Sequence, residues 1–210
     1  MKKEPSQELV AYVEEHVLPC YEGVDPAHGK DHILTVLVNS LRIAENHDVD
    51  IDMVYCIAVY HDIGIRYGRD DHEITSARWL REDQELLCFF SKDQIQTMAE
   101  AVEDHRASSK NPPRSIYGCI IAEADRDLSP NRIIARCADF AIAHHPGASE
   151  DEIVRICLNH LEEKYGPEGY LKLYLFDPRN EEGLRTLRLW MADGSMEQRL
   201  KEYLKTILFR

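Results

Sequence analysis

Apolar residues recur along most of this chain at intervals of three or four positions, the spacing that places them on one face of an α-helix. Capping residues, glycine and proline separate these apolar segments. In the first half the pattern predicts helices from Ser6 to near Pro19, from Pro26 or Asp31 to Asn46, from Asp50 to His61 and Asp62, from Asp70 past Leu80 toward Leu87, from Ser91 through Val102, and from about Ile116 to Asp125.

The second half continues the same pattern. Helices are predicted from Ser129 and Pro130, from Ser149 to near Gly166, through Leu184 to Trp190, and through Met196 to Ile207. No alternation typical of β-strands occurs, so we expect an all-α fold. We expect one domain, residues 1–210, with its core at about residues 25–145 and C-terminal helices at about residues 149–210 packed on that core.

Three of the predicted helix starts have the sequence of a capping box. In a capping box, two side chains three residues apart bind the free backbone N–H groups of the first turn. The three pairs are Asp70 with Glu73, Ser91 with Gln94, and Ser149 with Glu152.

Charge and cysteine content narrow the class of protein. The net charge of −13 opposes binding to nucleic acid, so we expect no stable nucleic-acid complex. No apolar run is long enough to span a bilayer, and residues 1–8 lead into an amphipathic helix, so we expect a cytoplasmic protein that binds no membrane. The six cysteines form no CxxC pair, which argues against a disulfide framework. The oligomeric state is open, with a homodimer among the options.

The segment 53–65 carries the first sign of chemistry. Residues 54–60 contain no charge, which predicts a helix buried on most sides. Asp62 follows His61 at its end, where burial and the negative end of the helix dipole both disfavour an ionised carboxylate. A divalent cation bound by both side chains would remove this cost. Without further context, the pair could instead cap the helix or bind an arginine.

Three ordered pieces of sequence supply that context: His32 after Asp31, the His61 and Asp62 pair, and Asp125 between Ala124 and Arg126. Their order resembles the H…HD…D signature of the HD-domain superfamily of metal-dependent phosphohydrolases, over about residues 25–145. The resemblance implies an HD-domain helical bundle around a divalent metal ion, with the ligands His32, His61, Asp62 and Asp125. Such a mixed nitrogen and oxygen set suits Mn²⁺, Mg²⁺, Fe²⁺, Ni²⁺ or Zn²⁺.

Three further histidines are candidates for the same site. His28 lies four residues before His32, so the two would share a face if both were helical. In many HD proteins, histidines between the HD pair and the last aspartate hold a second metal or contact the phosphate, which the resemblance implies for His72 and His105. We expect one metal ion, because His72 lies at a helix start near the surface and Arg106 follows His105. The catalytic work of His72 and His105 would then be to contact the substrate phosphate or to donate protons.

A basic loop offers groups that could bind an anion. Residues 105–115 contain three Lys or Arg side chains and no acid, in a chain that is otherwise acidic. We expect these cations, and two arginines close to the predicted ligands in sequence, to bind substrate phosphate. The predicted substrate-binding residues are His28, Arg66, Arg106, Lys110, Arg114 and Arg126. Solvated surface charge is the alternative for each cation.

Together these residues predict a metal-dependent phosphohydrolase that acts on a small phosphorylated metabolite or nucleotide. The metal would acidify water and polarise a phosphoryl oxygen, and Asp62 would hold and orient that water. A dinuclear-iron oxygenase on the same scaffold and a non-catalytic sensor of a phosphorylated ligand are the alternatives.

Overall fold

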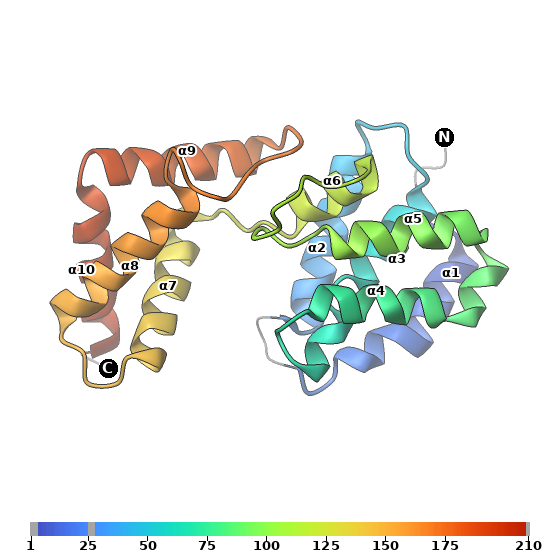
Figure 1. Cartoon of the computed structure of the whole chain (residues 1–210), viewed down its shortest axis with the longest axis horizontal. Coiled ribbons are helices and arrows are strands. Elements are labelled where there is room, and N and C mark those ends of the chain that lie inside the picture. The colour runs from blue at the N-terminus through green and yellow to red at the C-terminus, as the bar shows by residue number, and fades with distance from the viewer. Residues whose placement is uncertain (1–3, 25–27, 209–210) are drawn as a thin grey trace. The chain divides into compact units, whose positions relative to one another are not determined.

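The computed structural model describes residues 4–24 and 28–208, and Figure 1 shows their helices. Within these ranges the chain contains no β-strand, which confirms the all-α prediction. The chain divides into two compact units, one ending at Asp125 and the other beginning at Arg126. This division falls earlier than the expected core boundary near residue 145, because the helix that follows Arg126 packs against the C-terminal helices. The packing of one unit on the other stays a prediction.

The N-terminal unit is built from helices α1 to α6, joined by short turns. Their bounds are α1 Gln7–Tyr12, α2 Lys30–Ala44, α3 Ile51–Tyr60, α4 His72–Glu82, α5 Lys92–Glu103 and α6 Ile116–Ala124. Shorter elements connect them: the π-helical turn η1 Val13–Val17 and the 3-10 helices η2 Leu18–Tyr21, η4 Ile63–Tyr67 and η5 Gln84–Cys88. The alternative start of the second helix at Pro26 lies outside the described residues.

Helix α3 is the centre of the N-terminal unit (Figure 1). It packs against α2, α4, α5 and α6, and every α3 residue except Asp52 is buried, as the uncharged segment predicted. The Asp50 side chain caps the start of the helix by accepting a hydrogen bond from Asp52 N at 3.0 Å. Because α3 is enclosed, the residues at its C-terminal end are placed in the protein interior.

Gly64 allows α4 to approach the end of α3 closely. A Cβ atom on Gly64 would lie 2.5 Å from His72 O and 2.7 Å from Ser76 N. In the space left by the missing side chain, Gly64 N donates a hydrogen bond to Ser76 Oγ at 2.8 Å. The small size of Gly64 therefore brings α4 toward the end of α3, where Asp62 lies.

Two of the three predicted capping boxes, Ser91 with Gln94 and Ser149 with Glu152, are confirmed. The third is wrong, because α4 begins at His72 and no side chain caps it. Asp71, the residue before it, has a φ of 54°, so the chain is still turning where the box was predicted. Helix α4 also ends before Leu87, which belongs to η5.

The C-terminal unit consists of α7 Pro130–His144, α8 Glu150–Tyr165, α9 Pro178–Ala192 and α10 Ser195–Leu208. Helix α7 packs against the other three, and Leu161, Leu187 and Leu200 are fully buried in this unit. Residues 166–177 connect α8 to α9 without forming a helix or a strand. Among the described residues, no helix has both the length and the apolar character needed to cross a membrane.

Candidate metal centre

The four predicted metal ligands come together in the N-terminal unit. His32 lies in the first turn of α2, His61 and Asp62 follow α3, and Asp125 follows α6. Each side chain contributes one donor atom to the cluster: His32 Nε2, His61 Nε2, Asp62 Oδ2 and Asp125 Oδ1. The nitrogen–nitrogen and nitrogen–oxygen distances within it lie between 3.2 and 3.8 Å.

These separations fit the coordination shell of a metal ion. With metal–ligand bonds of about 2.1 Å, neighbouring ligand atoms lie about 3.0 Å apart in an octahedron and about 3.4 Å apart in a tetrahedron. Three helix ends would thus be joined through one ion, because the ligands come from α2, α3 and α6. The cluster can hold a divalent metal, and its mixed donor set does not single out one metal.

Hydrogen bonds to the backbone orient two of the site histidines. His61 Nδ1 donates to Ala58 O at 2.8 Å, and His105 Nδ1 donates to Val102 O at 2.6 Å. A carbonyl oxygen only accepts, so each neutral ring carries its proton at Nδ1 and presents a lone pair at Nε2. Metal-binding histidines are held in this way by a bond at the second ring nitrogen.

A second ligand group lies on the other side of the Asp62 carboxylate. Asp62 Oδ1 lies 3.2 Å from His72 Nε2 and 3.5 Å from His105 Nε2, and these two nitrogens are 3.2 Å apart. His72 Nδ1 donates to Arg69 O at 2.9 Å, so His72 Nε2 is also a lone pair. Among the described residues, the buried Asp62 Oδ1 has no hydrogen-bond partner. Three acceptor atoms therefore face one another, which requires a cation or a proton between them.

This geometry removes both sequence arguments for a single metal ion. His72 was expected near the surface, but it is only 9 % exposed because α4 lies against Gly64. Arg106 was expected to repel a second cation, but its guanidinium binds Glu73 at 3.2 Å. Asp62 directs one carboxylate oxygen at each ligand group, as a bridging carboxylate does. The number of metal ions stays a prediction.

The acids and histidines of the site shift one another's pKa values. Burial disfavours the ionised form of Asp62. When the site histidines carry an additional proton, the charge of His61 and a hydrogen bond from His105 outweigh burial and hold the Asp62 pKa well below its usual range. Burial likewise disfavours a charged His32, yet its hydrogen bonds with Asp125 and Asp62 raise the His32 pKa to about 9. Protons and metal ions would therefore compete for the same lone pairs.

His28 connects this site to the protein surface. It precedes α2 instead of lying in it, and its Nδ1 donates to Asp62 Oδ2 at 2.8 Å. The Arg69 guanidinium donates to His28 Nε2 at 3.1 Å. The sequence predicted a place for His28 near the site but missed Arg69, which lies in a turn without a motif. It also missed Tyr21, which donates to Val59 O at 2.6 Å and holds the last turn of α3.

The two arginines of the basic loop are neutralised by acids outside the loop. Arg106 pairs with Glu73 of α4 at 3.2 Å. Arg114 contacts Glu103 at 2.7 Å and Asp104 at 2.9 Å. The loop sequence contains no acid and predicts an open positive field, but folding brings these carboxylates to it. Both arginines are thus paired with carboxylates in this structure, and their binding of phosphate stays a prediction.

The family comparison covers the ligand residues of the site. The HD-domain family model matches residues 29–128, a range that includes all four predicted ligands. Residues 29–128 form an HD domain. A solved structure of a predicted HD superfamily hydrolase from an uncultured Thermotogales bacterium is 25% identical, covering 64% of this chain and 74% of that one with a TM-score of 0.49. No curated protein matches the chain.

The HD domain also contains the three remaining cations that the sequence predicted to bind substrate. Arg66 lies over the Tyr67 ring, 5.6 Å from its centroid. Lys110 is exposed in the basic loop. Arg126 begins the C-terminal unit, where its guanidinium lies 5.1 Å from the centroid of Tyr174. The substrate-binding role of these three residues stays a prediction.

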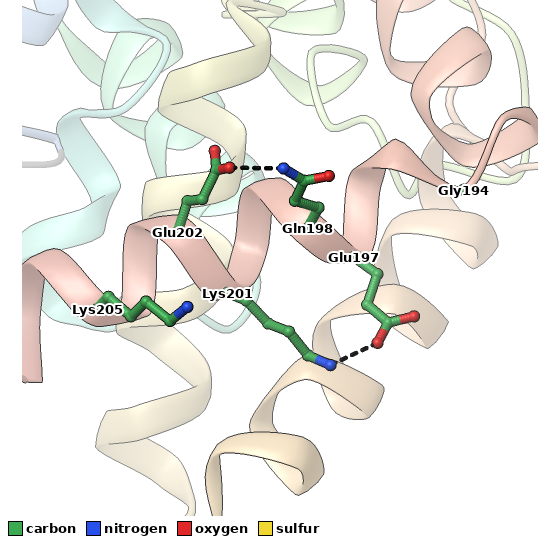
Figure 2. Close-up of a pocket in the computed structure, with 6 residues that line it drawn as sticks. All are labelled: Gly194, Glu197, Gln198, Lys201, Glu202 and Lys205. Atoms are coloured by element: carbon green, nitrogen blue, oxygen red, sulfur yellow. Dashed lines mark hydrogen bonds and ion pairs between the residues drawn. The ribbon is translucent and has the colours of Figure 1, made fainter.

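A surface pocket lies outside the HD domain, on α10. Figure 2 shows the residues that line it: Gly194, Glu197, Gln198, Lys201, Glu202 and Lys205. Lys201 Nζ donates to Glu197 at 2.7 Å, and Gln198 donates to Glu202 at 2.9 Å. These exposed side chains pair along one helix and include no histidine. The pocket therefore lacks the ligand chemistry of the cluster in the HD domain.

Proposed function

We propose that this protein is a metal-dependent phosphohydrolase that acts on a small phosphorylated metabolite or nucleotide. One observation carries the proposal: the two oxygens of Asp62 face separate groups of imidazole nitrogens. Three of these nitrogens, on His61, His72 and His105, present lone pairs. These acceptor atoms need a positive charge between them. The match of the same residues to the HD-domain family supports a divalent metal ion as that charge.

In this proposal, each side of Asp62 would hold one divalent ion. His32, His61 and Asp125 complete the first group, and His72 and His105 complete the second. Divalent ions in these groups would polarise a phosphoryl oxygen and make an attacking water more acidic.

The protein's own residues position the reacting centre. Asp62 orients both groups, and His28 holds its Oδ2 from outside the cluster by a 2.8 Å hydrogen bond. Because the Nε2 atoms of His72 and His105 already point at Asp62 Oδ1, we assign these residues to metal binding instead of proton donation. The carboxylate of Asp62 is buried, so its orientation does not depend on exposed, mobile contacts.

A phosphatase screen with defined metals tests this proposal. The chain is loaded in turn with Mn²⁺, Fe²⁺, Ni²⁺, Zn²⁺ and Mg²⁺ and assayed with p-nitrophenyl phosphate and a panel of phosphorylated metabolites and nucleotides. We expect metal-dependent release of phosphate that a chelator abolishes and that Asp62→Asn lacks. Absence of turnover with every metal and every phosphorylated compound would contradict the proposal and favour a binding protein.

A second candidate function follows from the shared position of Asp62. A carboxylate between two ligand groups also suits a dinuclear-iron oxygenase. Anaerobic loading with Fe²⁺, followed by a pulse of O₂ in the presence of candidate substrates, separates the two functions. Oxygen consumption coupled to product formation, seen with iron alone, would support the oxygenase, whereas hydrolysis with redox-inert Zn²⁺ or Mg²⁺ would support the phosphohydrolase.

A further inference from the structure

Arg69 differs from the two arginines of the basic loop, Arg106 and Arg114. It lies in the turn between η4 and α4 and is exposed to solvent. Within the described ranges it forms no ion pair with a carboxylate, whereas Arg106 is bound to Glu73 and Arg114 to Asp104. Its side chain instead donates a hydrogen bond to His28 Nε2 at 3.1 Å. The positive charge of Arg69 is therefore not compensated by a described acid.

The backbone of the same turn holds a ligand histidine. Arg69 O accepts the hydrogen bond from His72 Nδ1 at 2.9 Å. Gly68, just before it, has a φ of 129°, a conformation that glycine adopts without strain. The Arg69 main chain thus contacts one ligand group, while its side chain reaches His28, which binds Asp62 Oδ2. The guanidinium is therefore separated from Asp62 Oδ2 by one imidazole ring, that of His28.

A guanidinium in this place suits a phosphate group. Its planar N–H groups can bind phosphate oxygens in pairs, and the bond to neutral His28 uses only one of the five. A phosphate monoester has three unesterified oxygens, enough for one at each ligand group beside Asp62 and one at Arg69. A diester has only two and leaves none for Arg69.

We propose that Arg69 binds the terminal phosphate of the substrate and selects phosphate monoesters over diesters. The inference rests on the proposed function, because it takes Asp62 and its histidines as the reacting centre. It names the class of substrate and a binding residue that no sequence motif indicated.

Binding of inorganic phosphate to the manganese-loaded, full-length chain tests this role without turnover. Arg69→Gln should raise the phosphate Kd about tenfold to a hundredfold, because a charge-assisted interaction is lost. Arg69→Lys keeps the charge without the planar fork and should lose less. Arg78→Gln, which removes an exposed arginine within α4, is the matched control and should bind phosphate as the wild type does. Metal content should be equal in all four proteins.

A kinetic comparison tests the selectivity. In Arg69→Gln, kcat/KM for p-nitrophenyl phosphate should fall by the factor seen in phosphate binding. Turnover of bis(p-nitrophenyl) phosphate should stay unchanged, because that diester has no oxygen left for Arg69.

The outcomes separate this inference from the proposed function. Unchanged phosphate binding in Arg69→Gln, no phosphate binding by the wild type, or loss of metal in the variant would overturn the role of Arg69. Equal losses for monoester and diester would overturn the selectivity. Phosphate binding that depends on Arg69, in a protein that hydrolyses no phosphate ester, would support the binding role and overturn the proposed function alone.

Discussion

The two units of this chain use buried polar residues in different ways. In the N-terminal unit, the buried Asp62 and His105 come from separate helix ends and face each other as acceptor atoms. In the C-terminal unit, the equally buried Asp177 accepts a hydrogen bond from Arg179 N, two residues along the chain, and begins α9. A buried polar group that caps its own helix stabilises the fold. Groups that converge from distant segments without a compensating charge indicate a binding site.

Matched alanine variants of the two aspartates give the sharpest test of this comparison. Asp62→Ala should weaken metal binding by more than about a hundredfold and bring activity to background, because it removes an oxygen from both ligand groups. Asp177→Ala should keep full metal content and lose about 1 kcal/mol of unfolding free energy, the usual value of a helix cap. Metal analysis and chemical denaturation measure both effects. Full metal content in Asp62→Ala would show that the cluster is not the metal site.

The comparison can be refined within the N-terminal unit by counting ions. After anaerobic loading with Mn²⁺ or Fe²⁺, we expect two ions per wild-type chain and one in His105→Ala, because His105 contacts only the Oδ1 side of Asp62. Elemental mass spectrometry on desalted protein measures this ratio. A single ion in the wild type, unchanged in His105→Ala, would restore the mononuclear prediction and return His72 and His105 to a role in proton transfer or phosphate contact.

The pH dependence of metal affinity should differ between the cluster and an ordinary surface site. The His32 pKa is raised to about 9 in the metal-free fold. The protonated ring therefore stabilises this fold fully below about pH 6.5, the ordinary histidine pKa. This stabilisation is lost as the pH rises through about 9. Metal binding displaces that proton, so affinity should rise by up to about fiftyfold between about pH 7 and 9. Chelator competition at a series of pH values measures this slope, which His32→Asn should reduce. An equal slope in His32→Asn would assign the proton to another group.

The smallest expected effect concerns the basic loop. Arg114→Gln should cost less than about 1 kcal/mol of stability, since its ion pairs are partly exposed, and should leave KM unchanged. Arg69→Gln, by contrast, should raise KM for a phosphate monoester. Steady-state kinetics of the two variants compares a neutralised arginine with an uncompensated one. A higher KM in Arg114→Gln would reinstate the loop as a phosphate-binding element.

Several elements were predictable because their causes are local. The capping boxes at Ser91 and Ser149 depend on partners within a single turn, and both formed. The buried α3 followed from a run of residues without charge. The box at Asp70 failed because the turn before α4 follows the close packing at Gly64, which no local pattern contains.

By itself, the sequence determined the helical fold, the buried helix that ends at His61 and Asp62, and the ordered set of four predicted ligands. The tertiary structure decided which atoms meet. In the folded chain, His72 and His105 lie beside Asp62 Oδ1. Arg106 pairs with Glu73, and Arg69 contacts His28. The physical reason is one of range: helix periodicity and caps act over one or two turns, whereas ion pairs and ligand groups depend on how distant helices pack.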